Sequence, residues 1–465
     1  MNRRNFLKAA LASGALYSAG GLPVFGNIAR ASDAAMLSQR TLVNVMLYGG
    51  PDFRHLFTPA YNSNTASYGY QFWQARASAH SISQSNTAYQ DRWINNYHHV
   101  TDGANNFGIL NRCGWLKSMW DQGNVAIVCN AVGGNSRNHN HCELVMEHGN
   151  LTTGPNDFDR SGWGGRLAHA AAGNVLSLTK IPRSFCFGPH PFNPELHNNS
   201  NLVRARNSRD MSLFTAGPEH APDSLTASIT RNMENYYAAK SRELSPDSIY
   251  YRFIALERSL REFGEPIEER LQSIPVPEAI SALMDGGLSN KYFGEQIRNL
   301  YDSIVCNDIV SLRVASLEYG SWDSHKDQKD AIESKFEDLF GTGKALDTLY
   351  QELPPVTQDN MVLVLGGEFG RQLKANGDNG TDHGRGNSML IIGNAVRGGV
   401  YGDMFPESEL EILEERSSDI KGLTTFDQIY ARVCDWVSAN SSLLVFPDQS
   451  QSMVEAGVSL DNLFV

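Results

Sequence analysis

The stretch MVLVLGGEFGR at residues 361–371 sets the fold of this chain. Its first five residues are apolar without alternation, which indicates a strand that is buried on both faces of a sheet, as parallel strands are. Two glycines then predict a turn, and Glu368 and Arg371 follow it. We expect the sheet and its site to be built from units of this kind, because ligands bind beyond the carboxyl ends of parallel strands.

Further apolar runs of the same character lie along the chain, and helical patterns separate them. We expect parallel strands at residues 42–48, 125–129, 312–317, 361–365 and 389–392, and helices at 115–122, 330–340 and 425–439. This alternation predicts an α/β fold with a doubly wound, mostly parallel sheet and helices on both faces. Two segments rich in Asn, Ser and aromatic residues, 62–85 and 189–209, are predicted to be long loops.

The N-terminus has the three parts of an export signal: RRNFLK at 3–8, an apolar small-residue run at about 9–22, and ARA at 29–31. The paired arginines favour the twin-arginine pathway, so we expect a signal peptide at 1–31 and the twin-arginine translocase as a partner during export. The apolar run is shorter than the roughly 20 residues that span a bilayer. We therefore expect residues 32–465 to be periplasmic or secreted, without a stable membrane span after cleavage.

Composition narrows the possible partners. The formal net charge is −12, and Lys and Arg do not cluster, which argues against a nucleic-acid surface and favours a small-molecule or saccharide ester substrate. The six cysteines are scattered without a CxxC pair, so we expect buried thiols that act as small apolar side chains. One large α/β domain is predicted over 32–465, with a charged helical insertion at about 223–290 that either caps a site or extends the helix layer.

Most of the predicted strands run into glycine and then into possible ligands, so five loops should converge at one edge of the sheet. Asp323-x-His325 and Asp382-His383 are the most ligand-like, because small or aromatic residues surround them. Carboxylates and imidazoles suit a divalent metal, one ion or two, with Zn²⁺ preferred over Ca²⁺, Mg²⁺ or Mn²⁺. The five loops contain GGPD at 49–52, NSRNHNH at 135–141, YGSWDSH at 319–325, GGEFGR at 366–371 and GTDHG at 380–384.

Each of these features also has a structural interpretation. Glycine after a strand is ordinary turn chemistry, and a single Asp often caps a helix. His139 and His141 either flank the site or hold their Asn-rich loop together, and Arg166 either binds an anion or supports its helix. Only the coincidence of five loops favours a site.

Taken in order, the motifs resemble those of the DUF1501 family, whose members are twin-arginine-exported bacterial proteins of uncharacterised function in the alkaline phosphatase and sulfatase superfamily. The resemblance covers essentially the whole mature chain and implies an alkaline phosphatase-like fold. The residues that carry it are GGPD at 49–52, RNH at 137–139, GWGGR at 162–166, WDSH at 322–325, GEFGR at 367–371 and GTDHG at 380–384.

The resemblance also implies roles for individual residues. Asp52 and Glu368 would bind one metal ion, and Asp323, His325 and His383 would bind the other. The nucleophile should lie on the loop after the second strand, where relatives often have Arg-Ser-His.

This chain departs from that pattern at three places. It has Arg137-Asn138-His139, and asparagine cannot form a phosphoryl or sulfuryl intermediate. Glu368-Phe369 stands where phosphatases have Asp-His, which removes one imidazole ligand, and Pro51 replaces a more usual Asn.

Two functions therefore remain open. The first is a metal-dependent hydrolase or transferase of phosphate, sulfate or related esters. A metal-bound water, whose pKa is near 7, would supply hydroxide as the nucleophile in place of Asn138. Ser136 is a poorer substitute because it lies two residues from that position. His139 or His141 would protonate the leaving group. The second is a non-catalytic exported binding or assembly protein on the same fold. An oxidoreductase accessory role is suggested by the export route alone.

Overall fold

The computed structural model describes residues 39–446 and 458–465, except for 135, 151 and parts of the stretch from 190 to 268. Of that stretch it describes 197–198, 202–204, 208–209, 225–245, 248, 250–251, 254 and 266–267. The predicted signal peptide at 1–31 and part of the predicted insertion at 223–290 lie outside the described residues. None of the described helices is both long enough and apolar enough to cross a membrane.

A nine-stranded sheet forms the centre of the molecule, in the order β13-β5-β12-β11-β1-β10-β6-β9, with β14 pairing β5. All of its strands run in one direction except β12, which is antiparallel to both of its neighbours. The strands are β1 (Thr41–Met46), β5 (Val125–Val132), β6 (Asn174–Ser177), β9 (Leu202–Arg204), β10 (Leu312–Glu318), β11 (Met361–Gly366), β12 (Asn387–Ile392), β13 (Gly399–Tyr401) and β14 (Thr424–Thr425).

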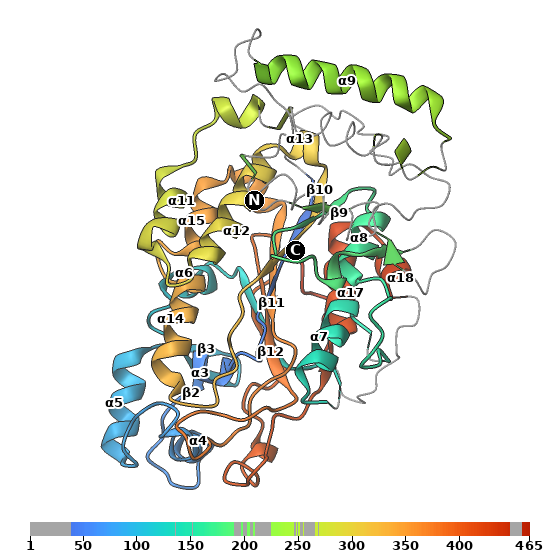
Figure 1. Ribbon diagram of the computed structural model, residues 1–465. Helices are drawn as coiled ribbons and strands as arrows, with labels where there is room; N and C mark the ends of the chain where they lie inside the picture. Colours follow the sequence, from blue (N-terminus) through green and yellow to red (C-terminus); the bar gives the residue numbers. More distant parts are fainter. Residues whose placement is uncertain are drawn as a thin grey trace.

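Helices cover both faces of this sheet, as Figure 1 shows, and the expected mostly parallel α/β arrangement is confirmed. One layer contains α6 (Gly114–Asp121), α11 (Glu278–Ala282), α12 (Lys291–Val305), α14 (Gln328–Phe340) and α15 (Ala345–Glu352). The other contains α7 (His139–His148), α8 (Trp163–Ala170), α17 (Phe426–Val437) and α18 (Ser442–Val445). The predicted helices at 115–122, 330–340 and 425–439 correspond to α6, α14 and α17.

The apolar core has two halves, one on each face of the sheet. Val43 and Val45 of β1 lie in one half, and Leu42 and Met46 lie in the other. A strand between two helix layers must be apolar on both sides, which is why its sequence does not alternate. All six cysteines are buried free thiols, as expected from the sequence.

The predicted direction of the strand at 389–392 is wrong. An apolar run reports burial on both faces but contains no information on direction, and β12 returns antiparallel beside β11 after the loop 367–386. The reversal matters for the site, because it places the start of β12 at the carboxyl edge of the other strands.

Smaller elements surround the sheet. Near one end lies a three-stranded antiparallel sheet of β2 (Phe57–Pro59), β4 (Asn105–Leu110) and β3 (Tyr97–Asp102), with α3 (Phe53–Leu56), α4 (Tyr68–Arg76) and α5 (Asn86–Asn96). Helix α4 lies inside the segment 62–85 that was predicted as a loop, so that prediction is wrong in part. Ser67 caps α4 by accepting a hydrogen bond from the Tyr70 amide.

The remaining described elements are short, apart from one helix. α9 (Leu225–Glu243) lies at the opposite end of the molecule in Figure 1, within the range of the predicted insertion. The others are α13 (Asn307–Val310), α16 (Pro355–Asp359), β7 (Gly188–Pro189), β8 (His197–Asn198), η1 (Ser184–Cys186), η2 (Leu283–Gly287) and η3 (Glu407–Glu409).

A buried imidazole after α4 makes the fold sensitive to acid. His80 is fully buried and stacks on His55 with ring centroids 4.1 Å apart, and neither of its ring nitrogens has a partner among the described residues. Burial, reinforced by the charge of a protonated His55, lowers the pKa of His80 well below 6.5. The folded protein therefore keeps His80 neutral while the unfolded chain binds a proton below about pH 6.5.

We expect this group to stabilise the fold fully above pH 6.5 and progressively less as the pH falls below that value. Between pH 7 and pH 5 the loss should be about 2 kcal/mol of the free energy of unfolding. The His80→Phe variant, which cannot bind the proton, should lose correspondingly less over the same interval. Urea unfolding of both proteins at the two pH values measures the difference, and equal losses would show that His80 is not responsible.

Candidate metal centre

The five loops singled out from the sequence meet at the carboxyl edge of the sheet. Four of them follow β1, β5, β10 and β11, and the fifth reaches the same edge because β12 runs in the opposite direction. Asn387, the first residue of β12, ties two of them together: its side-chain amide donates to the carbonyls of Pro51 at 3.0 Å and Phe369 at 3.1 Å.

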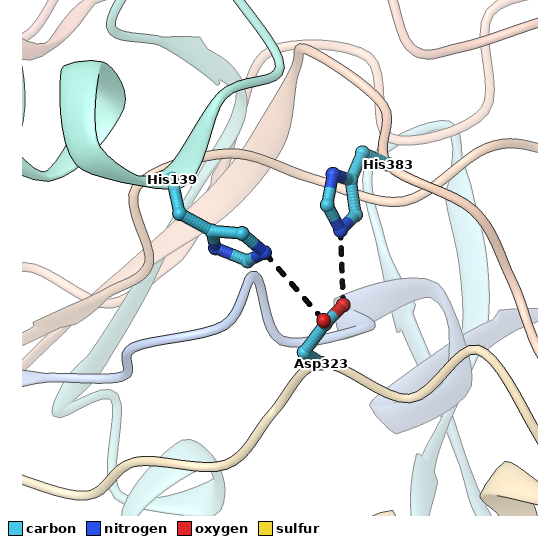
Figure 2. Close-up of side chains that lie close together, drawn as sticks. All are labelled: His139, Asp323 and His383. Carbon is cyan, nitrogen blue, oxygen red and sulfur yellow. Dashed lines mark hydrogen bonds and ion pairs between the residues drawn. The ribbon is translucent and has the colours of Figure 1, made fainter.

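Three imidazoles surround the carboxylate of Asp323. Oδ1 of Asp323 lies 2.9 Å from Nε2 of His383 and 2.9 Å from Nε2 of His325, and Oδ2 lies 3.6 Å from Nε2 of His139. Nε2 of His325 and Nε2 of His383 are themselves 2.9 Å apart. Figure 2 shows His139 at the start of α7 and His383 on a loop, both with their rings directed at Asp323.

The Nδ1 atom of each imidazole contacts an oxygen atom, and this contact orients the ring. Nδ1 of His139 is 2.9 Å from Oε1 of Glu368, and Nδ1 of His325 is 2.9 Å from Oδ1 of Asp382. Nδ1 of His383 is 3.0 Å from the carbonyl oxygen of Arg137. Metal-binding histidines almost always donate their second N–H to a carboxylate or a carbonyl in this way.

Counting protons shows what the cluster lacks. A neutral imidazole has one N–H. If the oxygen acceptor beside Nδ1 holds it there in all three rings, the three Nε2 atoms carry lone pairs. These lone pairs and the Asp323 carboxylate then face one another. Supplying a second proton to every ring would instead direct the N–H groups of His325 and His383 at each other over 2.9 Å. A divalent cation would satisfy His139, Asp323 and His383, whose possible ligand atoms lie within 4.8 Å of one another, and nitrogen and oxygen donors of this kind suit Zn²⁺.

The electrostatics of Asp323 and His383 agree with this count, whereas the raised pKa of His139 favours its protonated ring until a metal ion binds. Burial raises the pKa of Asp323, but its contacts with His383 and Arg371 outweigh burial and lower the pKa to about 2, so the carboxylate is charged. Burial and then the charge of Arg371 lower the pKa of His383, which favours the neutral ring. The hydrogen bond to Glu368 raises the pKa of His139, and the same contact would make its Nε2 a stronger metal ligand.

Arg371 links the loops of the centre to one another by hydrogen bonds. Its buried guanidinium donates to Asp323 Oδ1 at 2.9 Å and to the carbonyls of Trp322 at 2.9 Å, Gly50 at 2.7 Å and Thr381 at 3.1 Å, and it also contacts the carbonyl of Gly49. The segment at Gly49 packs so closely that no side chain fits there. With φ at +114°, a Cβ on this residue would lie 2.5 Å from the Asp323 nitrogen.

The cluster is open to solvent on one side. The side chains of Asp323 and His325 are each 43% exposed, and that of His139 is 33% exposed. A structural metal is usually closed off by its ligands, whereas a catalytic metal keeps a position open. The exposure of these ligands therefore fits an accessible centre.

Glu368 contacts Nδ1 of His139 and is not part of the group formed by His139, Asp323 and His383. Its buried carboxylate accepts from the backbone N–H of Gly49 at 2.9 Å and of Gly50 at 3.3 Å. His139, Glu143 and Glu368 form a second group whose possible ligand atoms lie within 4.8 Å of one another. Burial, and then the charge of Glu368, raises the pKa of Glu143 to about 7. Sequence reasoning missed Glu143, although its place one helical turn after His139 puts both on one face of α7.

The structure places Asp52 away from this cluster. Oδ2 of Asp52 lies 2.5 Å from Nη1 of Arg76 and accepts from the side-chain amide of Gln328 at 2.9 Å, and the carboxylate is buried. Burial raises the pKa of Asp52, but the charge of Arg76 prevails and the net shift is downward. Among the described residues, the groups with metal-ligand geometry do not include Asp52.

Three other candidates have structural contacts. Asn138 is the N-cap of α7, where its side chain accepts from the His141 amide at 3.2 Å. Nε2 of His141 is 2.8 Å from the Thr153 carbonyl oxygen. Arg166 donates to the carbonyls of Val445 at 2.6 Å and His148 at 2.7 Å, which joins α8 to α18 and α7. Only His139 of the four predicted catalytic residues thus contacts Asp323.

Comparison with known proteins gives one result. No curated protein and no solved structure matches the chain significantly. Residues 310–418 match the model of one family, described as a protein of unknown function (DUF1501). The matched part includes every element from β10 through η3 and contains Asp323, His325 and His383. The match supports the DUF1501 family for this part of the chain.

Proposed function

We propose that the protein is an exported, metal-dependent hydrolase or transferase of alkaline phosphatase-like fold that acts on a phosphate, sulfate or related ester. The observation that carries the proposal is the convergence of three Nε2 atoms on the partly exposed carboxylate of Asp323. Export rests on the signal pattern in residues 3–31.

The ligands of a divalent ion would be His139, Asp323 and His383, and His325 would be a further ligand beside Asp323 and His383. Arg371 would keep Asp323 charged and directed at the ion, while Glu368 and Asp382 would hold two of the imidazoles in the binding tautomer. When bound, the cation would act as a Lewis acid on the ester and lower the pKa of water to about 7, which supplies a nucleophile that Asn138 cannot.

Removal of the metal is the direct test of this function. Protein dialysed against a chelator should lose turnover of its preferred ester by about 100-fold or more, and added Zn²⁺ should restore it, because a metal ion contributes several kcal/mol of transition-state stabilisation. The assay would compare p-nitrophenyl phosphate, bis-p-nitrophenyl phosphate and p-nitrophenyl sulfate. Undiminished turnover in protein shown to be free of metal would contradict the proposal.

One observation favours the alternative of a binding or assembly protein. Asn138 caps α7, so the position where relatives often have a nucleophile serves the helix instead. If metal-loaded protein turns over none of the three esters, the centre is better explained as the binding site of a non-catalytic protein.

A further inference from the structure

Two arginines beside the metal centre share a single carboxylate. Arg385 donates to Asp419 through Nε at 2.9 Å and through Nη2 at 3.0 Å, which is a two-pronged contact. Arg137 donates to the same carboxylate through Nη2 at 2.6 Å, and from the same nitrogen to the Ser417 carbonyl at 3.1 Å. The Asp419 side chain is only 4% exposed, and its single negative charge is shared by two positively charged side chains.

The backbones of both arginines are fixed to the loops that hold the metal ligands. The carbonyl oxygen of Arg137 accepts from Nδ1 of His383 at 3.0 Å, and the carbonyl oxygen of Arg385 accepts from the Gly370 amide at 3.3 Å. Arg385 also follows His383 by two residues. The arginine pair, Arg137 and Arg385, is therefore part of the rim of the centre.

The arginine pair keeps both charge and donors available. One of its two positive charges is not matched by Asp419. Within the described part of the chain, Nε and Nη1 of Arg137 and Nη1 of Arg385 have no hydrogen-bond partner, and the side chains are 33% and 43% exposed. Guanidinium groups with free N–H donors bind phosphate and sulfate oxygens well, because their planar geometry matches two oxygens at once.

The metal centre itself has no net positive charge that would attract an anion. The carboxylates of Asp323, Asp382 and Glu368, the guanidinium of Arg371 and one divalent cation together sum to zero. A negatively charged ester would therefore meet a neutral centre. On the same loops, the arginine pair supplies one positive charge that Asp419 does not match.

We propose that Arg137 and Arg385 bind the anionic group of the substrate. The substrate is then an ester with a negatively charged phosphate or sulfate group, which is either the group whose bond is cleaved or a second group. This inference rests on the proposed function, since it assigns a substrate class to the same centre. If the two arginines merely joined the loops 133–138, 380–386 and 417–420, their replacement would alter stability and leave anion affinity unchanged.

Calorimetric titration of metal-loaded protein with inorganic sulfate and inorganic phosphate, at constant ionic strength, separates these possibilities. Each charge-assisted hydrogen bond that is lost should raise Kd about tenfold or more. We expect that rise for Arg137→Gln and for Arg385→Gln, and a larger one for the double variant. Arg432→Gln is the matched control, because Arg432 is an exposed arginine, 46% accessible, that pairs with Asp461. Its Kd should stay at the wild-type value.

Arg385→Lys provides a variant that keeps the charge and the ion pair but lacks the planar fork, and it should bind the anions with intermediate affinity. Metal content is measured on every sample, so that the two proposals fail in different ways. Wild-type protein without stoichiometric metal would overturn the proposed function. Full metal content combined with unchanged anion affinity in the double variant, or with no anion binding in the wild type, would overturn the role of the arginine pair alone.

Discussion

The Asp323→Asn variant is expected to bind its metal at least about 100-fold more weakly than the wild type. This loss exceeds the effect of removing a residue that only hydrogen-bonds to a metal ligand. Asn has the same shape as Asp, but it removes the negative charge at the point where three imidazoles converge. It also presents an amide N–H₂ group to the imidazoles in either orientation, since Oδ1 faces His325, His383 and Arg371 and Oδ2 faces His139.

Metal content measured by mass spectrometry on the purified protein tests this expectation. His383→Gln should show the same loss, because Nε2 of His383 is 2.9 Å from Asp323. Asp330→Asn is the matched control, since Asp330 is 87% exposed and contacts only Lys329 at 2.7 Å among its charged neighbours in the described structure. Wild-type metal content in Asp323→Asn would remove Asp323 from the ligand set.

Much of the fold could be predicted from the sequence because burial leaves a strong pattern. Strands packed between two helix layers are apolar throughout, and five such runs were located to within a few residues. Strand direction leaves no such pattern, since a reversed strand buries the same side chains. The antiparallel course of β12 was therefore missed, although the loop before it was expected at the correct edge.

The candidate site was predictable in its place but not in its internal contacts. Asp323, His325 and His383 are predictable as ligands because small or aromatic residues surround them, and the structure brings them together. The oxygen atoms that fix the tautomers come from Glu368, from Asp382 and from a backbone carbonyl. A backbone carbonyl has no sequence signature, and the partner of a given carboxylate depends on tertiary packing.

Asp52 shows how a missed helix changes the interpretation of a motif. GGPD after the first strand suggested a metal ligand, but the charge opposite Asp52 is Arg76, at the end of α4. That helix was predicted as a loop because its segment is rich in Asn, Ser and aromatic residues. Without the helix, nothing in the sequence places a guanidinium against this carboxylate.

Replacing Arg76 is expected to produce a large loss of stability. The Arg76→Met variant keeps the length of the side chain but leaves the buried carboxylate of Asp52 without its counter-charge, which should cost about 3–5 kcal/mol in the free energy of unfolding. Arg76 also donates to the backbone carbonyls of Leu373 and Gln372, each at 2.5 Å. Urea unfolding followed by tryptophan fluorescence measures the loss, and Arg432→Met, at an exposed site, should change stability by less than about 0.5 kcal/mol.

Combining Arg76→Met with Asp52→Asn should recover part of the lost stability, because the second substitution removes the uncompensated charge. The single variant Asp52→Asn then separates the two possible roles of this residue. Its carboxylate faces Arg76 and Gln328, so we expect reduced stability with the metal content of the wild type. A folded Asp52→Asn protein that has lost its metal would instead make Asp52 a ligand, through Oδ1, the buried oxygen that has no hydrogen-bond partner within the described residues.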